Sequence, residues 1–328
     1  MGGRSFTMVK VLITGAAGIV GFHSARKLLA EGHQVFGVDN INDDYDVDLK
    51  LARLKILNSH PNFEFKQLDI SNFENLKQAI NPLKITHILH LAAQAGVRYS
   101  LENPHAYIAS NVTGHLNILE FARHSDTLEH LVYASSSSVY GDREGGPFAE
   151  TDKVRNPVSL YAATKLSGEM LAQSYYNLYK IRQTGLRFFT VYGPWGRPDM
   201  AYFIFTHKIF NNEPITLFAP EEMRRDFTFI DDIVNVIPAI LAAPPKEGHA
   251  IYNLGNSHPN TLTQLVENIE AACGKVGEKI IKGKQKGDVS STFADVTNAQ
   301  REFGFNPQTP LEIGIPIFVK WYRGFYKI

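Results

Sequence analysis

Two segments of this chain hold residue types that move protons in enzymes. Tyr161 and Lys165 stand four positions apart in the segment YAATK, so a helix places both on one face. The unperturbed pKa of a tyrosine is near 10, so the phenol acts as a base at neutral pH only after a fall of roughly three pKa units. A neighbouring ammonium and a cationic ring in a bound ligand both favour the phenolate. The pair therefore predicts proton transfer at an oxygen of a ligand.

The second segment, Ala134–Gly141 (ASSSSVYG), sets four consecutive serines at the end of an apolar run. A serine hydroxyl beside the phenol could hydrogen-bond to the same substrate oxygen. On its own, a Tyr-x-x-x-Lys spacing is common on amphipathic helices and has no catalytic meaning. The serine run and the glycine loop described next make a catalytic site the better interpretation.

A dinucleotide-binding pattern lies near the start of the chain. The β-rich run Val9–Thr14 (VKVLIT) is followed by Gly15, Gly18 and Gly21, a G-x-x-G-x-x-G loop that precedes a helical pattern. The glycines permit a tight turn, the approach of a pyrophosphate and close packing of helix on strand, and the helix N-terminus adds amide donors. Asp39 ends the next strand, where a carboxylate accepts hydrogen bonds from a ribose and repels a 2′-phosphate. The pattern predicts NAD rather than NADP.

These residues need a scaffold that brings strand ends and helix starts to one edge. Short apolar runs alternate with helical segments: strands are predicted at Val9–Thr14, His33–Asp39, Phe63–Leu68, His87–Leu91 and His130–Ala134, and helices at Phe73–Ile80 and Asn111–Ala122. The alternation is typical of an α/β fold with a doubly wound, mostly parallel, Rossmann-like sheet. Right-handed crossovers place the carboxyl ends of the strands at one edge, where ligands bind.

After Leu186 the alternation gives way to segments rich in proline, glycine and aromatic residues. We therefore expect an NAD-binding Rossmann domain over residues 8–187 and a smaller C-terminal α/β domain over residues 188–328 that binds the substrate. The sequence has no flexible linker between them, so some segments of the second domain are expected to pack back on the first.

The composition limits the function classes. The 33 Lys and Arg balance the 33 Asp and Glu, so no net field draws the chain to nucleic acid or to an anionic membrane. A single cysteine, Cys273, suits a reducing cytoplasm, and the 12 histidines show no metal-ligand spacing. No apolar run approaches the roughly 20 residues that span a bilayer. We expect a cytoplasmic protein that uses no metal and recognises anionic ligands through local charges.

Four longer stretches make the sequence recognisable. They are His90–Pro104 (HLAAQAGVRYSLENP), Ala134–Gly141, Leu186–Met200 (LRFFTVYGPWGRPDM) and Arg224–Asp232 (RRDFTFIDD). From about Val9 to Tyr326 the chain resembles the extended short-chain dehydrogenase/reductase superfamily and, within it, the NAD-dependent nucleotide-sugar 4-epimerases. It is most similar to the UDP-glucuronate 4-epimerases, isomerases that form UDP-galacturonate for polysaccharide biosynthesis.

The resemblance implies a role for each catalytic candidate. Tyr161 would take the proton of the sugar O4 while NAD accepts the C4 hydride, giving a transient 4-keto sugar. Lys165 would bind the nicotinamide ribose and lower the pKa of Tyr161, and Ser136 would support the proton transfer. The keto sugar would turn and take the hydride back on its other face, so that C4 is inverted and NAD stays bound.

Three positions bear on the choice of sugar. Related decarboxylases carry a glutamate where this chain has Ser138, and galactose-type epimerases carry an asparagine where it has Thr190. Arg197 could bind a sugar carboxylate bidentately and hold it in an unreactive geometry. These residues favour a UDP-uronic acid, while a UDP-glucose or UDP-N-acetylglucosamine 4-epimerase and a UDP-glucuronate decarboxylase stay open as alternatives. An inactive dinucleotide-sensing protein also stays open, although such proteins typically lose the tyrosine or the lysine.

The resemblance extends to residues expected to bind the two ligands. Besides Tyr161 and Lys165, the expected NAD-binding set comprises Gly15, Gly18, Ile19, Val20, Gly21, Asp39, Asn40, Asp69, Ile70, Leu91, Ala92, Ala93, Gln94, Ser110, Ala134, Ser135 and Phe189. The set expected to bind the UDP-sugar comprises Arg98, Ser136, Ser137, Ser138, Thr190, Arg197, Arg225, Gln285 and Asp288. Arg225 matches the family's diphosphate-binding arginine, and Asp288 resembles its ribose-binding acid.

Two helical stretches, Asn111–Arg123 and Leu160–Tyr179, carry more apolar surface than contact with a sheet requires. Relatives pair the corresponding helices in a four-helix seam. We expect a homodimer that binds a UDP-sugar and has neither a nucleic acid nor a membrane as partner.

Overall fold

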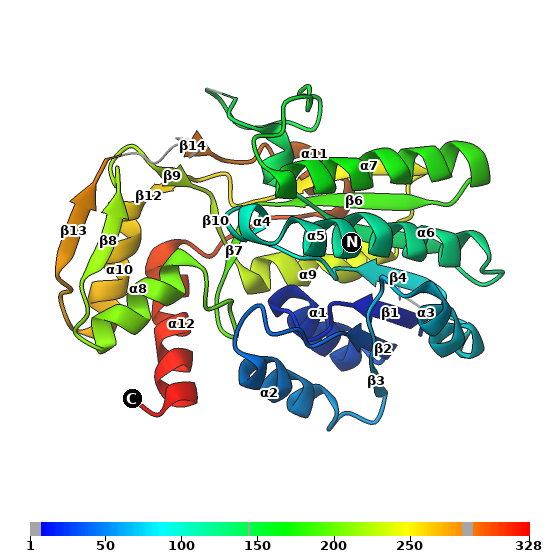
Figure 1. Cartoon of the computed structure of the whole chain (residues 1–328), viewed down its shortest axis with the longest axis horizontal. Helices are drawn as coiled ribbons and strands as arrows, with labels where there is room; N and C mark the ends of the chain where they lie inside the picture. Colours follow the sequence, from blue (N-terminus) through cyan, green and yellow to red (C-terminus); the bar gives the residue numbers. More distant parts are fainter. Residues whose placement is uncertain (1–7, 144, 284–290) are drawn as a thin grey trace.

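A parallel β-sheet forms the centre of the computed structural model, which describes residues 8–143, 145–283 and 291–328. Over these ranges the sheet has seven strands in the order β11-β6-β5-β4-β1-β2-β3 (Figure 1). The strands are β1 (Lys10–Thr14), β2 (Gln34–Asp39), β3 (Phe63–Gln67), β4 (His87–His90), β5 (His130–Ser136), β6 (Gln183–Phe188) and β11 (His249–Leu254). The predicted Rossmann-like α/β fold is confirmed.

Helices cover both faces of the sheet because successive side chains of a strand point to opposite faces. In β1, the buried Val11 and Ile13 pack with α1 and α9, whereas the buried Leu12 packs with α3 and α6. The helical segments of this part are α1 (Ile19–Ala30), α2 (Val47–Leu57), α3 (Phe73–Ile80), η1 (Asn81–Leu83), α4 (Tyr99–Glu102), α5 (Pro104–Tyr107), η2 (Ile108–Gly114), α6 (His115–Arg123), η3 (Ser137–Tyr140), α7 (Leu160–Tyr179), α9 (Ile230–Leu241) and α11 (Thr297–Phe303). This is the doubly wound arrangement that the alternating pattern predicts.

A second lobe, on the left in Figure 1, lies beside the sheet and has an aromatic core. Its elements are β7 (Thr190–Tyr192), α8 (Ala201–Phe210), β8 (Ile215–Phe218), β9 (Arg224–Arg225), β10 (Phe227–Phe229), β12 (Asn260–Thr261), α10 (Leu262–Cys273), β13 (Lys279–Lys282), β14 (Ser291–Thr292) and α12 (Leu311–Tyr326). The rings of Tyr202 and Phe318 meet edge to face at 4.8 Å, joining α8 to α12. Ile19 of α1 is buried in the same core, so the two lobes share apolar contacts.

The chain crosses between the lobes several times after residue 188. Helix α9 packs against α1, strand β11 pairs with β6 and so extends the central sheet, and α11 packs against β11. Segments from the second half of the sequence therefore complete the first lobe. The division into domains at residues 187 and 188 stays a prediction.

Two helical segments differ from the sequence prediction. The sequence pattern does not predict α2, whose Lys50 and Arg53 are buried although both are charged. The helix predicted at Asn111–Ala122 starts as the π-helical segment η2 and becomes α-helical only at His115. Among the described residues, no helix combines the length and apolar character needed to cross a bilayer.

Candidate active site

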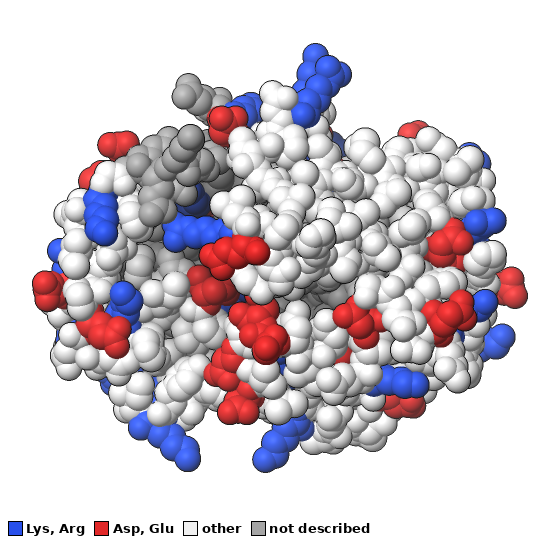
Figure 2. Space-filling view, in the orientation of Figure 1, with Lys and Arg blue, Asp and Glu red and all other residues white. Residues whose placement is uncertain are grey.

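The carboxyl ends of the central strands open into a cavity of about 540 Å³. The face seen in Figure 2 is hollowed where the two lobes meet, and charges of both signs are interspersed over that face. Every described residue that the sequence predicts for binding NAD or the UDP-sugar lines this cavity. Gln285 and Asp288 lie outside the described residues. The structure thus brings the predicted set together, and the role of each member stays a prediction.

The backbone of the glycine loop is packed too closely for side chains at two of its glycines. Gly15 has a φ of +72°, and a Cβ atom there would lie 2.8 Å from the backbone nitrogen of Ala92. A Cβ atom on Gly21 would lie 2.1 Å from the carbonyl oxygen of Gly15. Helix α1 begins at Ile19, and its N-cap residue, Gly18, has no side chain to cap the first turn. Its first amides can therefore donate to an anion, and the loop fits a dinucleotide pyrophosphate.

Asp39 ends β2 beside this loop. Its Oδ2 accepts the N–H of Ala17 at 3.0 Å, and its Oδ1 accepts the N–H of Ile41 at 2.9 Å. Burial raises the pKa of Asp39, and the two hydrogen bonds and the charges of Lys50 and Arg53 oppose that rise. A carboxylate has about four acceptor positions, so Asp39 keeps capacity for the hydroxyls of a ribose. The residue fits the role that the sequence predicts for it.

Helix α7 presents Tyr161 and Lys165 to the cavity on one face. Its start is fixed by Ser159, whose hydroxyl accepts the N–H of Ala162 at 3.1 Å. The ammonium of Lys165 donates to the carbonyl oxygen of Ala134 at 3.0 Å, next to the serine run. Burial lowers the pKa of Lys165 to about 8. The lysine is thus anchored at the strand end where the sequence expects it to act.

The electrostatics of Tyr161 differ from the sequence expectation. Burial raises its pKa, while a hydrogen bond with Ser136 and the charge of Arg197 lower it. The sequence predicts the fall of about three pKa units that a neutral-pH base requires from two sources, the ammonium of Lys165 and the cationic ring of a bound ligand. In the structure, Ser136 and Arg197 are the groups that act in this direction, and burial outweighs both. Tyr161 is partly buried, and the ring of Tyr107 packs edge-on against it with the ring centres 6.1 Å apart.

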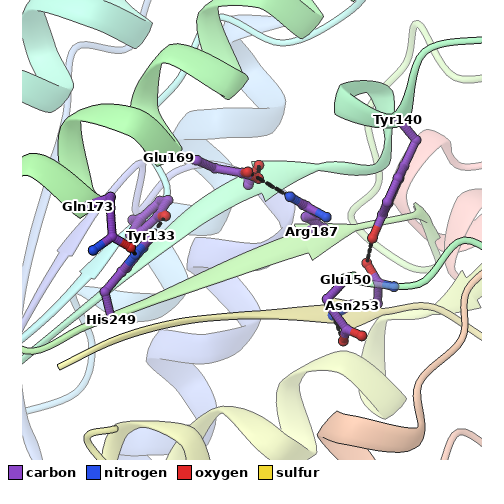
Figure 3. Close-up of polar contacts among 9 residues, drawn as sticks. Tyr133, Tyr140, Glu150, Glu169, Gln173, Arg187, His249 and Asn253 are labelled. Carbon is purple, nitrogen blue, oxygen red and sulfur yellow. Dashed lines mark hydrogen bonds and ion pairs between the residues drawn. The ribbon is translucent and has the colours of Figure 1, made fainter. Parts of the chain in front are cut away.

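A buried ion pair lies below the serine run. Arg187 donates from Nε and Nη2 to the two carboxylate oxygens of Glu169, at 2.9 and 2.7 Å, and Figure 3 shows the pair between α7 and the strands. The hydroxyl of Ser135 donates to the same carboxylate at 2.5 Å. Glu169 follows Lys165 by four positions, so the pair braces the face of α7 that carries the candidate base. The hydroxyl proton of Ser135, a predicted NAD-binding residue, is therefore committed to Glu169.

Arg197 reaches the cavity from the loop after β7. Its Nε and Nη2 donate to Asp199 at 3.0 and 2.6 Å, and Nη2 also lies 3.4 Å from the carbonyl oxygen of Ala95. Asp199 therefore holds one edge of the guanidinium, and its side chain is 47% exposed, whereas that of Arg197 is 19% exposed. The planar group is oriented before any ligand arrives.

The other predicted sugar-binding residues surround this arginine. The hydroxyl of Ser136 donates to the hydroxyl of Ser138 at 3.2 Å, and the backbone N–H of Ser138 donates to the hydroxyl oxygen of Ser136 at 3.2 Å. Thr190 sits in β7, where its N–H donates to the carbonyl of Asp226 at 3.1 Å. Arg98, Ser137 and Arg225 complete the lining.

Two pairs of residues shape the part of the cavity whose members are predicted to bind NAD. Gln94 is held through its backbone, whose N–H donates to Asn111 Oδ1 at 2.8 Å and whose carbonyl accepts from Asn111 Nδ2 at 2.9 Å. Asp69 accepts the side-chain amide of Asn40 at 3.1 Å and the N–H of Ser71 at 2.8 Å. The π-helical segment η2 thus positions Asn111 against the loop that follows β4.

Sequence reasoning missed several residues that line the cavity. Four of them follow β2, and a signal for these existed, since loops at the carboxyl ends of strands line ligand sites in such sheets. The ammonium of Lys50 donates to both the backbone and the side-chain oxygen of Asn42 at 2.6 Å and lies 4.2 Å from the ring centre of Tyr45. The missed lining residues are Asn42, Asp44, Tyr45, Lys50, Leu68, Ala95, Gly96, Val97, Gly141, Val158, Ser159, Phe188, Val191, Met200 and Thr292.

Comparison with known proteins shows which family has this architecture. A family model described as the NAD dependent epimerase/dehydratase family matches residues 11–255. The chain belongs to this family. It is 45% identical over 339 residues to UDP-glucuronate 4-epimerase 2 of Arabidopsis thaliana, covering 99% of this chain and 78% of that protein. It is 46% identical over 335 residues to Protein CapI of Staphylococcus aureus, covering 97% of this chain and all of that protein.

A solved structure agrees with these relatives. The UDP-glucuronic acid 4-epimerase of Bacillus cereus, in complex with UDP-glucuronic acid and NAD, superposes with a TM-score of 0.89 at 31% identity. The match covers 97% of this chain and 100% of that one. Similarity of this extent supports both the fold and the nature of the cavity.

Proposed function

We propose that this chain is an NAD-dependent isomerase that interconverts UDP-glucuronate and UDP-galacturonate by inverting C4. The observation that carries the proposal is the proximity of a base and a carboxylate-binding group in one cavity. The charge of Arg197 is close enough to Tyr161 to lower the pKa of Tyr161. A sugar whose O4 meets Tyr161 would then have Arg197 within reach of its carboxylate. The UDP-glucuronate 4-epimerase relatives support this substrate.

Each catalytic residue has a separate role in the proposed reaction. Tyr161 accepts the proton of O4 and later returns it, and Ser136 hydrogen-bonds to the same oxygen. Lys165 supplies a positive charge at the strand end and holds the nicotinamide ribose. NAD, when bound along the glycine loop, supplies the hydride acceptor and donor for C4. The sugar turns between the two hydride transfers, which inverts C4 without net oxidation.

The same cavity must keep the carboxylate from leaving as CO2, because a 4-keto uronate is a β-keto acid. Arg197 grips the carboxylate through the edge of its guanidinium that Asp199 leaves open, and Ser138 and Thr190 add hydroxyl donors. Positions 136–138 are all serine, so these three positions supply no carboxylate to assist elimination or decarboxylation. This favours simple epimerisation.

The remaining site residues bind the two nucleotides in this proposal. Asp39 and the glycine loop hold the adenosine half of NAD, with Asn40, Asp69, Ile70 and Gln94 along the groove. Arg225 and Arg98 also line the cavity, and the UDP diphosphate is assigned to them in this proposal. Gln285 and Asp288 are assigned to the UDP end by resemblance alone.

Assembly and location belong to the same proposal. Ile108, Met170 and Leu178 are exposed apolar side chains on η2 and α7, which suits a helical seam between two copies. A homodimer is therefore expected, and sedimentation of the wild type against Met170→Glu tests it: the variant should sediment as a monomer. The free, buried Cys273 suits the cytoplasm, and the product suits the supply of uronic acids to polysaccharides.

One assay tests the function. The purified protein is incubated with UDP-glucuronate and no added NAD, while sugar-proton NMR and CO2 release are followed. UDP-galacturonate should appear without CO2. A UDP-pentose with CO2 would identify a decarboxylase, and turnover of UDP-glucose in preference to UDP-glucuronate would identify a neutral-sugar epimerase.

A further inference from the structure

Arg53 of α2 is a fully buried charged residue between the two lobes. Its hydrogen-bond acceptors are three backbone carbonyls and the hydroxyl of Tyr45. Burying a guanidinium costs several kcal/mol unless its donors are satisfied. Because Arg53 is buried at this cost next to a ligand cavity, the segments that its hydrogen bonds position are of interest.

One side of the guanidinium holds the glycine loop. Nη1 donates to the carbonyl oxygen of Ala17 at 2.6 Å and to the hydroxyl of Tyr45 at 2.8 Å. The N–H of the same Ala17 donates to Asp39 at 3.0 Å. Ala17 is thus gripped through both its N–H and its carbonyl, immediately before Gly18 and the start of α1. Arg53 therefore sets where the amides of the pyrophosphate site stand.

The other side holds the loop that carries Arg197. Nη2 donates to the carbonyl oxygens of Trp195 at 2.5 Å and Gly196 at 3.1 Å, the two residues directly before Arg197. Trp195 has a φ of +61°, a left-handed conformation that costs a non-glycine residue free energy and needs support from its surroundings. A Cβ atom on Gly196 would lie 1.8 Å from the hydroxyl of Tyr202. The loop of Trp195 and Gly196 can therefore move little unless Arg53 and Tyr202 move with it.

Helix α1 adds two ties between the same loops. The ring of His23 hydrogen-bonds to the carbonyl of Pro194 at 3.0 Å, and Phe22 packs against Trp195 with ring centres 5.4 Å apart. Both contacts are made by residues of α1 that follow the glycine loop, so they do not hold the loop itself. Arg53 alone among these three residues bonds to the carbonyls of both loops.

We propose that Arg53 is a positioning residue that couples the NAD site to the site of the sugar carboxylate. The guanidinium is planar and rigid, so a shift of Trp195 and Gly196 on one side displaces the acceptors of Ala17 and Tyr45 on the other. A ligand held by Arg197 then stabilises the loop that holds the pyrophosphate, and the reverse follows by linkage. The inference deepens the proposed function and rests on it, since it assumes NAD at the glycine loop and a UDP-sugar at Arg197.

The test measures release of the retained NAD rather than turnover. The holoenzyme is diluted, with and without saturating UDP-glucuronate, into an excess of a dehydrogenase and its alcohol substrate, which reduce released NAD to NADH. The half-time of NAD release is followed by the fluorescence of that NADH. Arg53→Lys keeps the charge but presents one compact ammonium that cannot span both loops. Arg53→Met keeps the aliphatic stem and leaves no charge to bury, so it serves where the lysine variant does not fold. Lys55→Met, on the exposed side of the same helix, is the matched control.

In the wild type and in Lys55→Met, UDP-glucuronate should slow NAD release about five-fold or more. In either Arg53 variant the slowing should fall below about two-fold. Slowing of wild-type size in a folded Arg53 variant would overturn the inference, because the ligand would then only be blocking the exit of NAD. No slowing in the wild type would also overturn it.

Turnover of UDP-glucuronate by the same wild-type preparation separates the two claims. Turnover without coupled NAD release refutes the role of Arg53 and leaves the function intact. Bound NAD whose release UDP-glucuronate slows, without turnover, refutes the function and leaves the coupling intact.

Discussion

The buried pair of Glu169 and Arg187 gives a quantitative prediction for stability. Glu169 is fully buried, Arg187 is 2% exposed, and two short hydrogen bonds join them. Glu169→Gln keeps the size of the side chain but removes its charge, which leaves the guanidinium buried without a counter-charge. Breaking a buried pair in this way costs about 3–5 kcal/mol. The hydroxyl of Ser135 also loses its charged acceptor, so the cost should not fall below that range.

The expected change in melting temperature follows from the size of the chain. The entropy of unfolding is about 2.1 cal/mol/K per residue, which for 328 residues is about 0.7 kcal/mol/K. A loss of 3–5 kcal/mol should therefore lower the melting temperature by about 4–7 °C. Differential scanning calorimetry on the wild type and Glu169→Gln measures it directly.

Two further variants test the reasoning behind that number. Adding Arg187→Met to Glu169→Gln removes the stranded charge, so the double variant should be more stable than Glu169→Gln alone. Glu302→Gln breaks the exposed pair of Arg301 and Glu302, joined at 3.1 Å, and should cost less than about 0.5 kcal/mol. If Glu169→Gln melts within 1 °C of the wild type, or if the double variant shows the full sum of two losses, the ion pair does not stabilise the fold as described.

Three other outcomes are expected. Tyr161→Phe should lower kcat by roughly 10²–10⁴-fold while the protein keeps its bound NAD by absorbance, and activity close to that of the wild type would remove Tyr161 as the base. Arg197→Ala should lower kcat/KM for UDP-glucuronate at least about ten-fold but change the Kd of UDP less than about two-fold, whereas equal losses would make the arginine a structural support. Burial lowers the pKa of His23 and of His130 to about 4, so between pH 6.5 and 4 the unfolded chain binds more protons than the folded one. Urea titrations should show the free energy of unfolding falling by about 2 kcal/mol per histidine from pH 7 to pH 5, and a flat profile would contradict this.

The sequence was informative wherever a local pattern had a single structural solution. The glycine spacing after an apolar strand, with Asp39 at the end of the next strand, predicts the loop that the structure shows. The four-residue spacing of Tyr161 and Lys165 predicted a shared face of α7. In each case the chemistry depends on residues close in sequence, and their period alone determines their geometry.

Helix α2 escaped the same reasoning for a physical reason. Its segment VDLKLARLKIL alternates charged and apolar residues without a clean polar face, because Lys50 and Arg53 point inward. Amphipathic periodicity finds helices that bury only apolar residues. Amphipathic periodicity does not predict a helix that buries charged residues to position loops.

Contacts between distant segments were also beyond the sequence. The pairing of Arg53 with the carbonyls of Trp195 and Gly196 joins residues more than 140 positions apart. The pKa of Tyr161 depends on its burial and on the charge of Arg197, and the spacing of Tyr161 and Lys165 predicts neither. Polar networks of this kind follow from the three-dimensional arrangement of the loops, which local patterns do not encode.

The central claim is that the hydrogen on C4 of the sugar leaves and returns within one closed site, while Tyr161 handles the O4 proton. UDP-glucuronate carrying deuterium at C4 tests this most directly, with the product analysed by NMR in ordinary water. The account predicts UDP-galacturonate that retains the deuterium at C4, formed without added NAD and without CO2. Loss of the label to solvent, or a pentose product, would contradict it.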